Sequence, residues 1–161
     1  MGVFMILLNG VTGFNYVNKK SPPTVDRRQF KNICFIAITK NGGNILSFDE
    51  PNVGRNFYKV KVKVFGEHMY ILLNISYPFL AFATLIEFGN IKFVDNHLLN
   101  REFSPFYRVL NVSELNEPLL VRDVKGKIIV ENDNELNDAE VHQITYWKPV
   151  RIGDVIFNYW D

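Results

Sequence analysis

The amino-acid sequence predicts a single α+β domain over residues 1–161, dominated by antiparallel β-sheet, with one or two short helices, one of them near the C-terminus. A chain of 161 residues suits one domain with one core. With 47% hydrophobic and 22% charged residues, the composition is that of a globular chain and not of a disordered one. Several segments alternate apolar and polar residues around turns, whereas only one carries a complete helix-start signal.

The first segment, residues 1–14 (MGVFMILLNGVTGF), is apolar and is expected to form a strand. It lacks a positively charged start, and Asn9 and Gly10 interrupt it, which distinguishes it from a signal peptide or a membrane-spanning helix. The single cysteine, Cys34, lies in an apolar stretch and is expected to be a buried small hydrophobe. Without an export signal or a second cysteine, the expected location is the cytoplasm, with no membrane partner.

Residues 24–47 fit two different structures. Five apolar residues follow the i, i+3, i+4, i+7, i+8 spacing of a helix that would end at Asn41-Gly42-Gly43: Phe30, Ile33, Cys34, Ala37 and Ile38. The same segment is rich in isoleucine and phenylalanine, and Asn-Gly-Gly is also typical of a hairpin turn. We favour the hairpin because residues with high helix propensity are few.

Residues 57–75 alternate lysine with valine and then become almost wholly apolar, as expected for a β-hairpin. A two-residue turn at Gly66-Glu67 would place Val64 opposite Met69 and direct the apolar side chains of both strands to one face. The opposite face would keep its ammonium groups in water, and it carries Lys59, Lys61 and Lys63. The net charge of +1 also argues against a nucleic-acid-binding domain, although a nucleic-acid or structural role of this lysine strip remains an alternative.

The rest of the chain supplies three β segments and the clearest helix. Residues 78–88 fit a buried short helix or a buried strand, residues 90–96 a strand, and residues 119–132 a hairpin with its turn at Lys125-Gly126. In residues 136–147 (LNDAEVHQITYW), Asn137 can cap a helix and Glu140, three residues later, completes a capping box. Residues 153–161 alternate apolar side chains and are expected to form a terminal strand.

Few groups are spaced for catalysis. Asp49-Glu50 and Asp95-Asn96-His97 could each bring an acid and a base into a cleft, so an enzyme that uses either pair is an alternative. Both stretches occur in turn-like contexts, where Asp and Asn are common for backbone reasons. The three histidines lack metal-ligand spacing, one cysteine cannot form CxxC, and no phosphate-binding GKS/T loop occurs. The sequence therefore predicts neither a metal nor another cofactor.

Charge is divided unevenly along the chain. Residues 1–66 carry ten Lys and Arg against three Asp and Glu, a net charge of +7, and residues 67–161 carry eight against fourteen, a net charge of −6. Much of the negative charge lies in residues 131–140 (ENDNELNDAE), which are followed by no Lys or Arg until Lys148. Such a stretch is typical of a solvated loop and helix start, and it can also attract a basic protein partner.

Three stretches in the C-terminal part carry a family resemblance: SELNEPL at residues 113–119, LNDAE at 136–140 and YWKPVRIGDVIFNYWD at 146–161. Together they resemble small bacterial immunity proteins that accompany polymorphic toxins. The resemblance implies a cytosolic binding protein without catalytic activity. Such a protein neutralises its cognate toxin, often a nuclease, by covering the active site or a nearby surface.

This resemblance also suggests which residues would contact the toxin. The acidic side chains would steer a basic partner, as a nuclease that binds phosphate is expected to be; they are Glu131, Asp133, Glu135, Asp138 and Glu140. Tyr146 or Trp147 would serve as an aromatic anchor. Trp147 and Trp160 fit core positions equally well.

Overall fold

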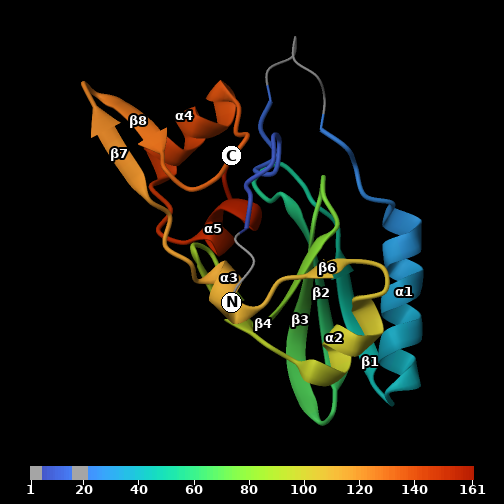
Figure 1. Ribbon diagram of the computed structural model, residues 1–161. Helices are drawn as coiled ribbons and strands as arrows, with labels where there is room; N and C mark the ends of the chain where they lie inside the picture. Colours follow the sequence, from blue (N-terminus) through green and yellow to red (C-terminus); the bar gives the residue numbers. More distant parts are fainter. Residues whose placement is uncertain (1–4, 16–21) are drawn as a thin grey trace.

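A computed structural model describes residues 5–15 and 22–161, and its central element is a twisted, mostly antiparallel sheet flanked by helices, which confirms the α+β class (Figure 1). The strands are ordered β1-β2-β3-β4-β5, and a short β6 pairs with β4 in parallel. Their bounds are β1 Asn44–Asp49, β2 Phe57–Val64, β3 Glu67–Asn74, β4 Phe79–Glu87, β5 Asn90–Val94 and β6 Arg108–Val109. A separate hairpin consists of β7 (Val121–Val124) and β8 (Lys127–Val130).

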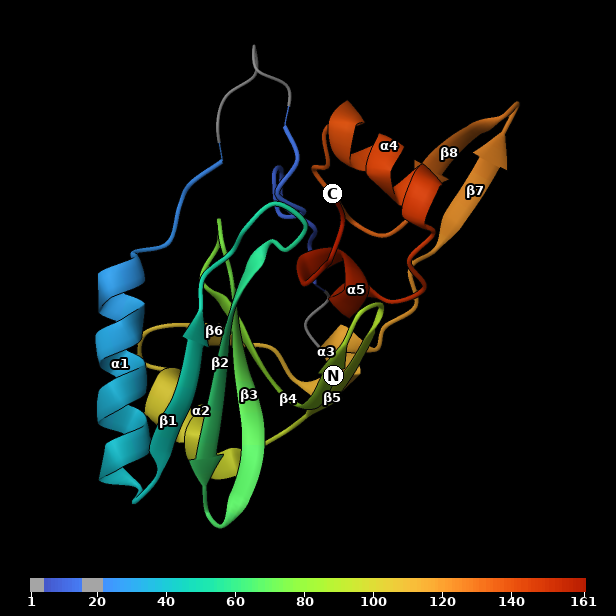
Figure 2. The same ribbon diagram turned by 180° about the vertical axis from the view of Figure 1, so that it is seen from behind.

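The described part of the chain has five helices, more than the one or two expected from the sequence. They are α1 Arg27–Lys40, α2 His97–Phe103, α3 Val112–Leu115, α4 Asp138–Trp147 and α5 Ile152–Ile156. In both views α1 lies beside β1 at one side of the molecule, α4 and the β7–β8 hairpin lie at the opposite side, and α5 lies nearer the middle (Figures 1 and 2). Among the described residues, none of the helices has the length and apolar composition needed to cross a membrane.

The sheet is buried on both faces, but by different partners. One face carries the β2 valines and packs against α1 and α2, where Phe30 and Phe103 are fully buried. The other face is covered by the C-terminal part of the chain: one buried cluster there contains Leu72 and Ala81 of the sheet, Ile144 of α4 and Val155 of α5. Because the two clusters of buried residues lie on opposite faces, the C-terminal helices are fixed to the sheet independently of α1.

The β2–β3 hairpin has the predicted faces but a different register. Val60, Val62 and Val64 are buried, whereas Lys59 and Lys61 are half-buried and Lys63 is exposed. The turn residues are Phe65 and Gly66, both at positive φ (56° and 76°), so Val64 pairs with Glu67 and not with Met69. A turn with two left-handed residues places glycine second, and this shifts every predicted pair by two residues while leaving the faces unchanged.

The hairpin expected at residues 24–47 is wrong, because α1 occupies most of this segment. The Asp26 side chain caps the helix by accepting a hydrogen bond from the Gln29 N–H at 2.9 Å. The apolar stripe is buried against the valine face, and this packing outweighs the β propensity of its residues: Phe30, Cys34, Ala37 and Ile38. Asn41-Gly42-Gly43 therefore connects a helix to a strand, and a Cβ on Gly43 would lie 2.5 Å from the Lys63 carbonyl oxygen.

The expected first and last strands are wrong as well. In residues 5–15, the only strand-type pairing is an isolated bridge between Leu7 and Asn134; the remainder of the predicted first strand, residues 1–4, lies outside the described residues. Most of residues 153–161 form the end of α5 and an irregular tail. The strand at residues 90–96, the hairpin at 119–132 and the helix at 136–147 are confirmed, and residues 78–88 form the strand β4.

Buried asparagine side chains, and not backbone pairing between strands, hold these irregular segments to the sheet. Asn74 is fully buried, and its Nδ2 donates to the carbonyl oxygens of Val11 (2.9 Å) and Ile156 (2.8 Å). Asn56 Nδ2 donates to the same two oxygens, each at 3.0 Å. The backbone N–H of Asn158 in turn donates to Asn56 Oδ1 at 2.8 Å. These contacts join the N-terminal segment, the sheet and the C-terminal tail.

Alkaline pH is expected to destabilise the fold. Burial raises the pKa of the Cys34 thiol above its ordinary value of 9.0 and the pKa of Tyr107 above its ordinary value of 10.0. Above about pH 9 the unfolded chain therefore loses protons that the folded chain keeps, so the free energy of unfolding falls as pH rises, by up to about 1.4 kcal/mol per pH unit and group. Urea unfolding at pH 8, 9 and 10 measures this slope.

A control for the alkaline effect is Tyr107→Phe, which removes one of the groups with a raised pKa and should make the slope shallower. A free energy of unfolding that stays constant from pH 8 to pH 10 in the unmodified protein would contradict the expectation.

Candidate protein-binding surface

The connection between β8 and α4, together with the first residue of α4, exposes four carboxylates, which we call the acidic segment: Glu131, Asp133, Glu135 and Asp138. Its backbone is held in place by Leu7, whose N–H donates to the Asp133 carbonyl (3.1 Å) and whose carbonyl accepts from the Glu135 N–H (2.7 Å). Among the described residues, the only cation within salt-bridge distance of these four is Arg122, 3.8 Å from Glu131. Both partners of that pair are exposed, so it neutralises the segment little.

Glu140 was expected to belong to this surface, and the structure contradicts this expectation because its side chain is fully buried. Its Oε1 accepts a hydrogen bond from the Gly10 N–H at 2.7 Å. Its Oε2 accepts from the Thr12 N–H at 2.9 Å and from the Thr12 hydroxyl at 2.5 Å. The carboxylate also completes the predicted capping box with Asn137 at the start of α4. Glu140 therefore ties α4 to the N-terminal segment and has no exposed charge to offer a partner.

The two proposed aromatic anchors lie at the other end of α4. Tyr146 is 73% exposed, and its ring meets that of Trp147 edge-on at a centroid distance of 5.1 Å. Trp147 is half-buried, and its Nε1 donates to Gln143 Oε1 at 3.0 Å. Trp160 is 9% exposed and belongs to the core. Tyr146 is thus free to contact a partner, and Trp147 reaches both the surface and the interior.

A cavity of about 200 Å³ opens beside Trp147, between the β4–β5 turn and the tail that follows α5. We call it the aromatic pocket. Phe88 and Val150 lie at its exposed side, being 75% and 70% exposed. Its aromatic lining consists of Phe88, Trp147, Phe157, Tyr159 and Trp160. Burial raises the pKa of Tyr159 above its ordinary value, so this phenol stays neutral at physiological pH.

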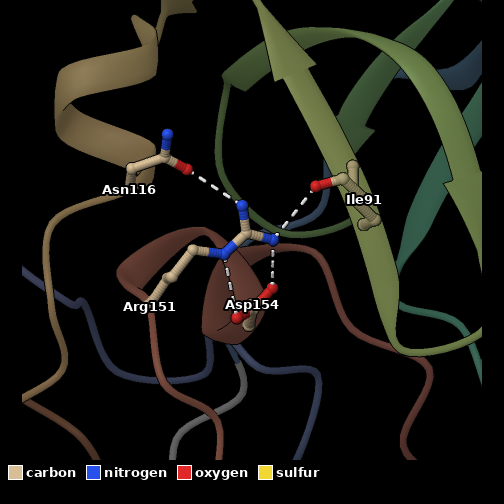
Figure 3. Close-up of polar contacts among 4 residues, drawn as sticks. All are labelled: Ile91, Asn116, Arg151 and Asp154. Atoms are coloured by element: carbon tan, nitrogen blue, oxygen red, sulfur yellow. Dashed lines mark hydrogen bonds and ion pairs between the residues drawn. The ribbon is translucent and has the colours of Figure 1, made fainter.

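Arg151 holds one wall of the aromatic pocket in position (Figure 3). Its guanidinium donates to both carboxylate oxygens of Asp154, at 3.1 and 2.6 Å, to Asn116 Oδ1 at 2.9 Å and to the Ile91 carbonyl at 3.1 Å. The guanidinium carbon also lies 5.1 Å from the centroid of the Phe93 ring. One side chain thus joins β5, the end of α3 and α5, which fixes the spacing of the segments that line the pocket.

Three of the residues considered for catalysis, Asp49, Glu50 and Asp95, make structural contacts. Asp95 Oδ1 accepts a hydrogen bond from the Val112 N–H at 3.0 Å, at the start of α3, and His97 is exposed at the first position of α2. Asp49 lies 3.9 Å from the Lys59 ammonium group, and Glu50 pairs with Arg27. In the described part of the chain, no group of three or more His, Cys, Asp and Glu side chains is arranged to hold a metal ion.

The sequence pointed to the acidic segment and to Tyr146 and Trp147, but it did not reveal the aromatic pocket. The lining comes from three separate segments, around residues 88–91, 147–150 and 154–160, which only the fold brings together. The available signal was an aromatic residue beside a turn glycine, Phe88-Gly89, where a polar residue is more usual. Comparisons of the chain with protein-family models, with curated proteins and with solved structures found no match.

Proposed function

We propose that this chain is a cytoplasmic protein-binding inhibitor, an immunity protein of a polymorphic toxin system, that neutralises a basic toxin by direct contact. The toxin class that best fits an acidic partner is a nuclease, whose own site must be positively charged to bind phosphate. In this proposal the acidic segment provides electrostatic attraction and Tyr146, with Trp147, provides apolar contact area. No chemical step is assigned to the inhibitor.

The observation that carries this proposal is the combination of four exposed carboxylates at one end of α4 with a largely exposed tyrosine at the other. Clusters of uncompensated negative charge raise the association rate with cationic proteins and disfavour anionic ones. Exposed aromatic side chains supply large contact areas at a low entropic cost. The two features together are typical of a protein–protein interface and are of little use to a site that binds a phosphorylated metabolite.

Co-expression tests the proposal directly. The candidate toxin is the C-terminal domain encoded immediately upstream of this chain, if that neighbour is a large secreted protein. Cells that express this domain should stop growing, and co-expression of the inhibitor should restore growth and give a complex that co-purifies. Failure both to restore growth and to co-purify with a domain that is toxic on its own would refute the proposal.

Charge reversal in the acidic segment should slow binding. We expect Glu135→Lys combined with Asp138→Lys to reduce the association rate constant with the toxin about tenfold at low salt, because both side chains are exposed and steering depends on the summed charge. Stopped-flow fluorescence at two salt concentrations measures the rate.

Glu67→Lys serves as the matched control for a single Glu135→Lys variant, because it makes the same charge change at an exposed residue beside the β2–β3 turn. The control should leave the association rate nearly unchanged. Equal slowing by Glu67→Lys and Glu135→Lys would mean that only the net charge matters, and the acidic segment would lose its assigned role.

A further inference from the structure

We propose that the aromatic pocket receives a single aliphatic or aromatic side chain of the protein partner. This inference rests on the proposed function in one respect, namely that the partner is a protein. It adds a contact that neither the acidic segment nor Tyr146 supplies: a concave, apolar site for an inserted anchor residue. Four features of the pocket support it: the chemistry of the lining, the size of the cavity, the exposure of its rim and the rigidity of its walls.

Three of the polar side chains that line the pocket are already hydrogen-bonded within the protein. Trp147 Nε1 donates to Gln143, and both Asp154 carboxylate oxygens accept from Arg151. Asn158 Nδ2 donates to the carbonyls of Thr12 (3.0 Å) and Val155 (3.1 Å). In the described residues, no buried side-chain nitrogen or oxygen lacks a hydrogen-bond partner. Because its buried polar side chains are already paired and five aromatic rings line it, the pocket favours an apolar ligand.

The cavity is small. Sites for cofactors and drug-sized ligands usually have volumes of about 300–1,000 Å³, whereas the aromatic pocket has about 200 Å³. That volume suits one large side chain and excludes most nucleotides and cofactors. Anchor residues of protein interfaces fill pockets of this kind, which are made mainly of aromatic rings.

The rim of the pocket exposes apolar surface that the fold itself does not use. Phe88 is 75% exposed, and its ring centroid lies 5.7 Å from that of Tyr159. Val150 is 70% exposed on the opposite segment. Outside the lining itself, Tyr146 packs on the lining residue Trp147 and is 73% exposed. Exposed apolar groups around an apolar depression are typical of the centre of a protein–protein interface. There, contacts that surround the inserted side chain exclude water from it.

The walls are held in shape without a ligand. The Arg151 contacts fix the segment at residues 151–154 against β5 and α3. Lys148 ends α4 in the left-handed conformation, at φ 52°, which turns the chain sharply so that Pro149 and Val150 form the adjoining wall. A preformed pocket lowers the entropic cost of binding, because few of its side chains must be ordered when the anchor enters.

The partner can be specified further from the geometry of α4. This helix of 10 residues separates the acidic segment from the aromatic pocket, a distance of about 15 Å at 1.5 Å per residue. A fitting partner therefore presents an exposed leucine, isoleucine, methionine or phenylalanine about 15 Å from a cluster of lysine or arginine side chains. The basic cluster would govern the association rate, and the inserted side chain the dissociation rate.

The pocket can be tested before any partner is known. The probes are N-acetyl-leucinamide and N-acetyl-phenylalaninamide, with N-acetyl-glycinamide and N-acetyl-lysinamide as controls. They are titrated into the ¹⁵N-labelled protein, and the indole N–H signals of Trp147 and Trp160 are followed. The two apolar probes should give saturable shifts at lining residues, with a dissociation constant on the order of 1 mM, and the two control probes should not.

Two variants make the probe experiment specific. Phe88→Ser removes an exposed wall residue and should weaken the apolar probes about tenfold or more, and Val150→Ser should act in the same direction. Phe106→Ser is the matched control, since Phe106 is also exposed (55%) and is not part of the lining. Absence of saturable shifts, or equal binding by Phe88→Ser and the unmodified protein, would overturn the proposal.

Other occupants give distinguishable results. If the same signals move as the protein is concentrated without probe, a second copy of this chain occupies the pocket and the proposal is wrong. If indole binds while the leucine and phenylalanine probes do not, the pocket is a small-molecule site and the proposal is equally wrong.

Failure of the proposed function and failure of the pocket can also be told apart. With a toxin in hand, Phe88→Ser should raise the dissociation rate constant about tenfold and leave the association rate constant unchanged, the reverse of the Glu135→Lys effect. Probe binding without any toxin would leave the pocket standing and remove the immunity function. Toxin binding with an unchanged dissociation rate for Phe88→Ser would keep the function and remove the pocket.

Discussion

Replacing Glu140 with alanine is expected to lower the free energy of unfolding by about 3–5 kcal/mol. The substitution leaves two backbone N–H groups, of Gly10 and Thr12, and the Thr12 hydroxyl without their acceptor in a site that water does not reach. Each unsatisfied buried donor costs about 1–3 kcal/mol, and the capping contact with the Asn137 N–H at 3.2 Å is lost as well. Urea unfolding followed by tryptophan fluorescence measures the difference.

Glu135→Ala is the matched control for this substitution. It makes the same chemical change five residues earlier, at an exposed position of the acidic segment, and should alter the free energy of unfolding by less than about 0.5 kcal/mol. Faster amide hydrogen exchange at residues 10–12 in Glu140→Ala would place the effect at the N-terminal segment. A Glu140→Ala variant as stable as Glu135→Ala would show that the buried carboxylate is replaceable by water.

The elements that the sequence predicted correctly are those defined by neighbouring residues. The capping box of Asn137 and Glu140 depends on side chains three positions apart, and α4 begins where it indicates. The β7–β8 hairpin turns at Lys125-Gly126, with both residues at positive φ, as a short glycine-containing turn favours. The valine and lysine faces of β2 follow from strand periodicity alone, which is why they survive the change of register.

The elements that the sequence failed to predict depend on contacts between distant segments. The α1 segment has mixed propensities, and its helix is selected because Phe30 and Ile38 can bury themselves on the valine face. The two terminal segments are apolar enough to form strands. Their carbonyl groups at Val11 and Ile156 nevertheless accept hydrogen bonds from the side chains of Asn56 and Asn74, and not from the backbone of a neighbouring strand. No pattern of neighbouring residues predicts that an asparagine will form hydrogen bonds with backbone groups dozens of residues away.

The same distinction applies to the candidate site. Exposure of the acidic segment follows from its density of charge, and four of the five carboxylates are exposed as expected. The prediction that Glu140 is exposed was wrong, because the number of charges in a segment does not reveal that the backbone N–H groups of Gly10 and Thr12 bind this carboxylate. The position of Glu140 in the sequence did carry one indication of this. A glutamate at N3 of a capping box accepts a hydrogen bond from the backbone at the start of the helix, so its carboxylate is already engaged within the protein.

Replacing Asn74 with aspartate is expected to destabilise the fold by about 3 kcal/mol or more at neutral pH. The change keeps the shape of the side chain but replaces the Nδ2 donor by an oxygen that faces the carbonyl oxygens of Val11 and Ile156. Asn74 is fully buried, so water cannot screen the repulsion. The oxygen that accepts from the Ser76 and Tyr77 N–H groups is retained, which isolates the loss of the donor.

Denaturant unfolding of Asn74→Asp, with Asn32→Asp as control, separates this long-range contact from the effect of an added charge. Asn32 is exposed on α1, so its aspartate variant should change the free energy of unfolding by less than about 0.5 kcal/mol. The penalty at position 74 should also shrink as pH is lowered, because a protonated aspartate regains one donor. Equal stability of the two variants at neutral pH would mean that apolar packing alone holds the terminal segments to the sheet. The asparagine contacts would then be a consequence of the fold and not one of its causes.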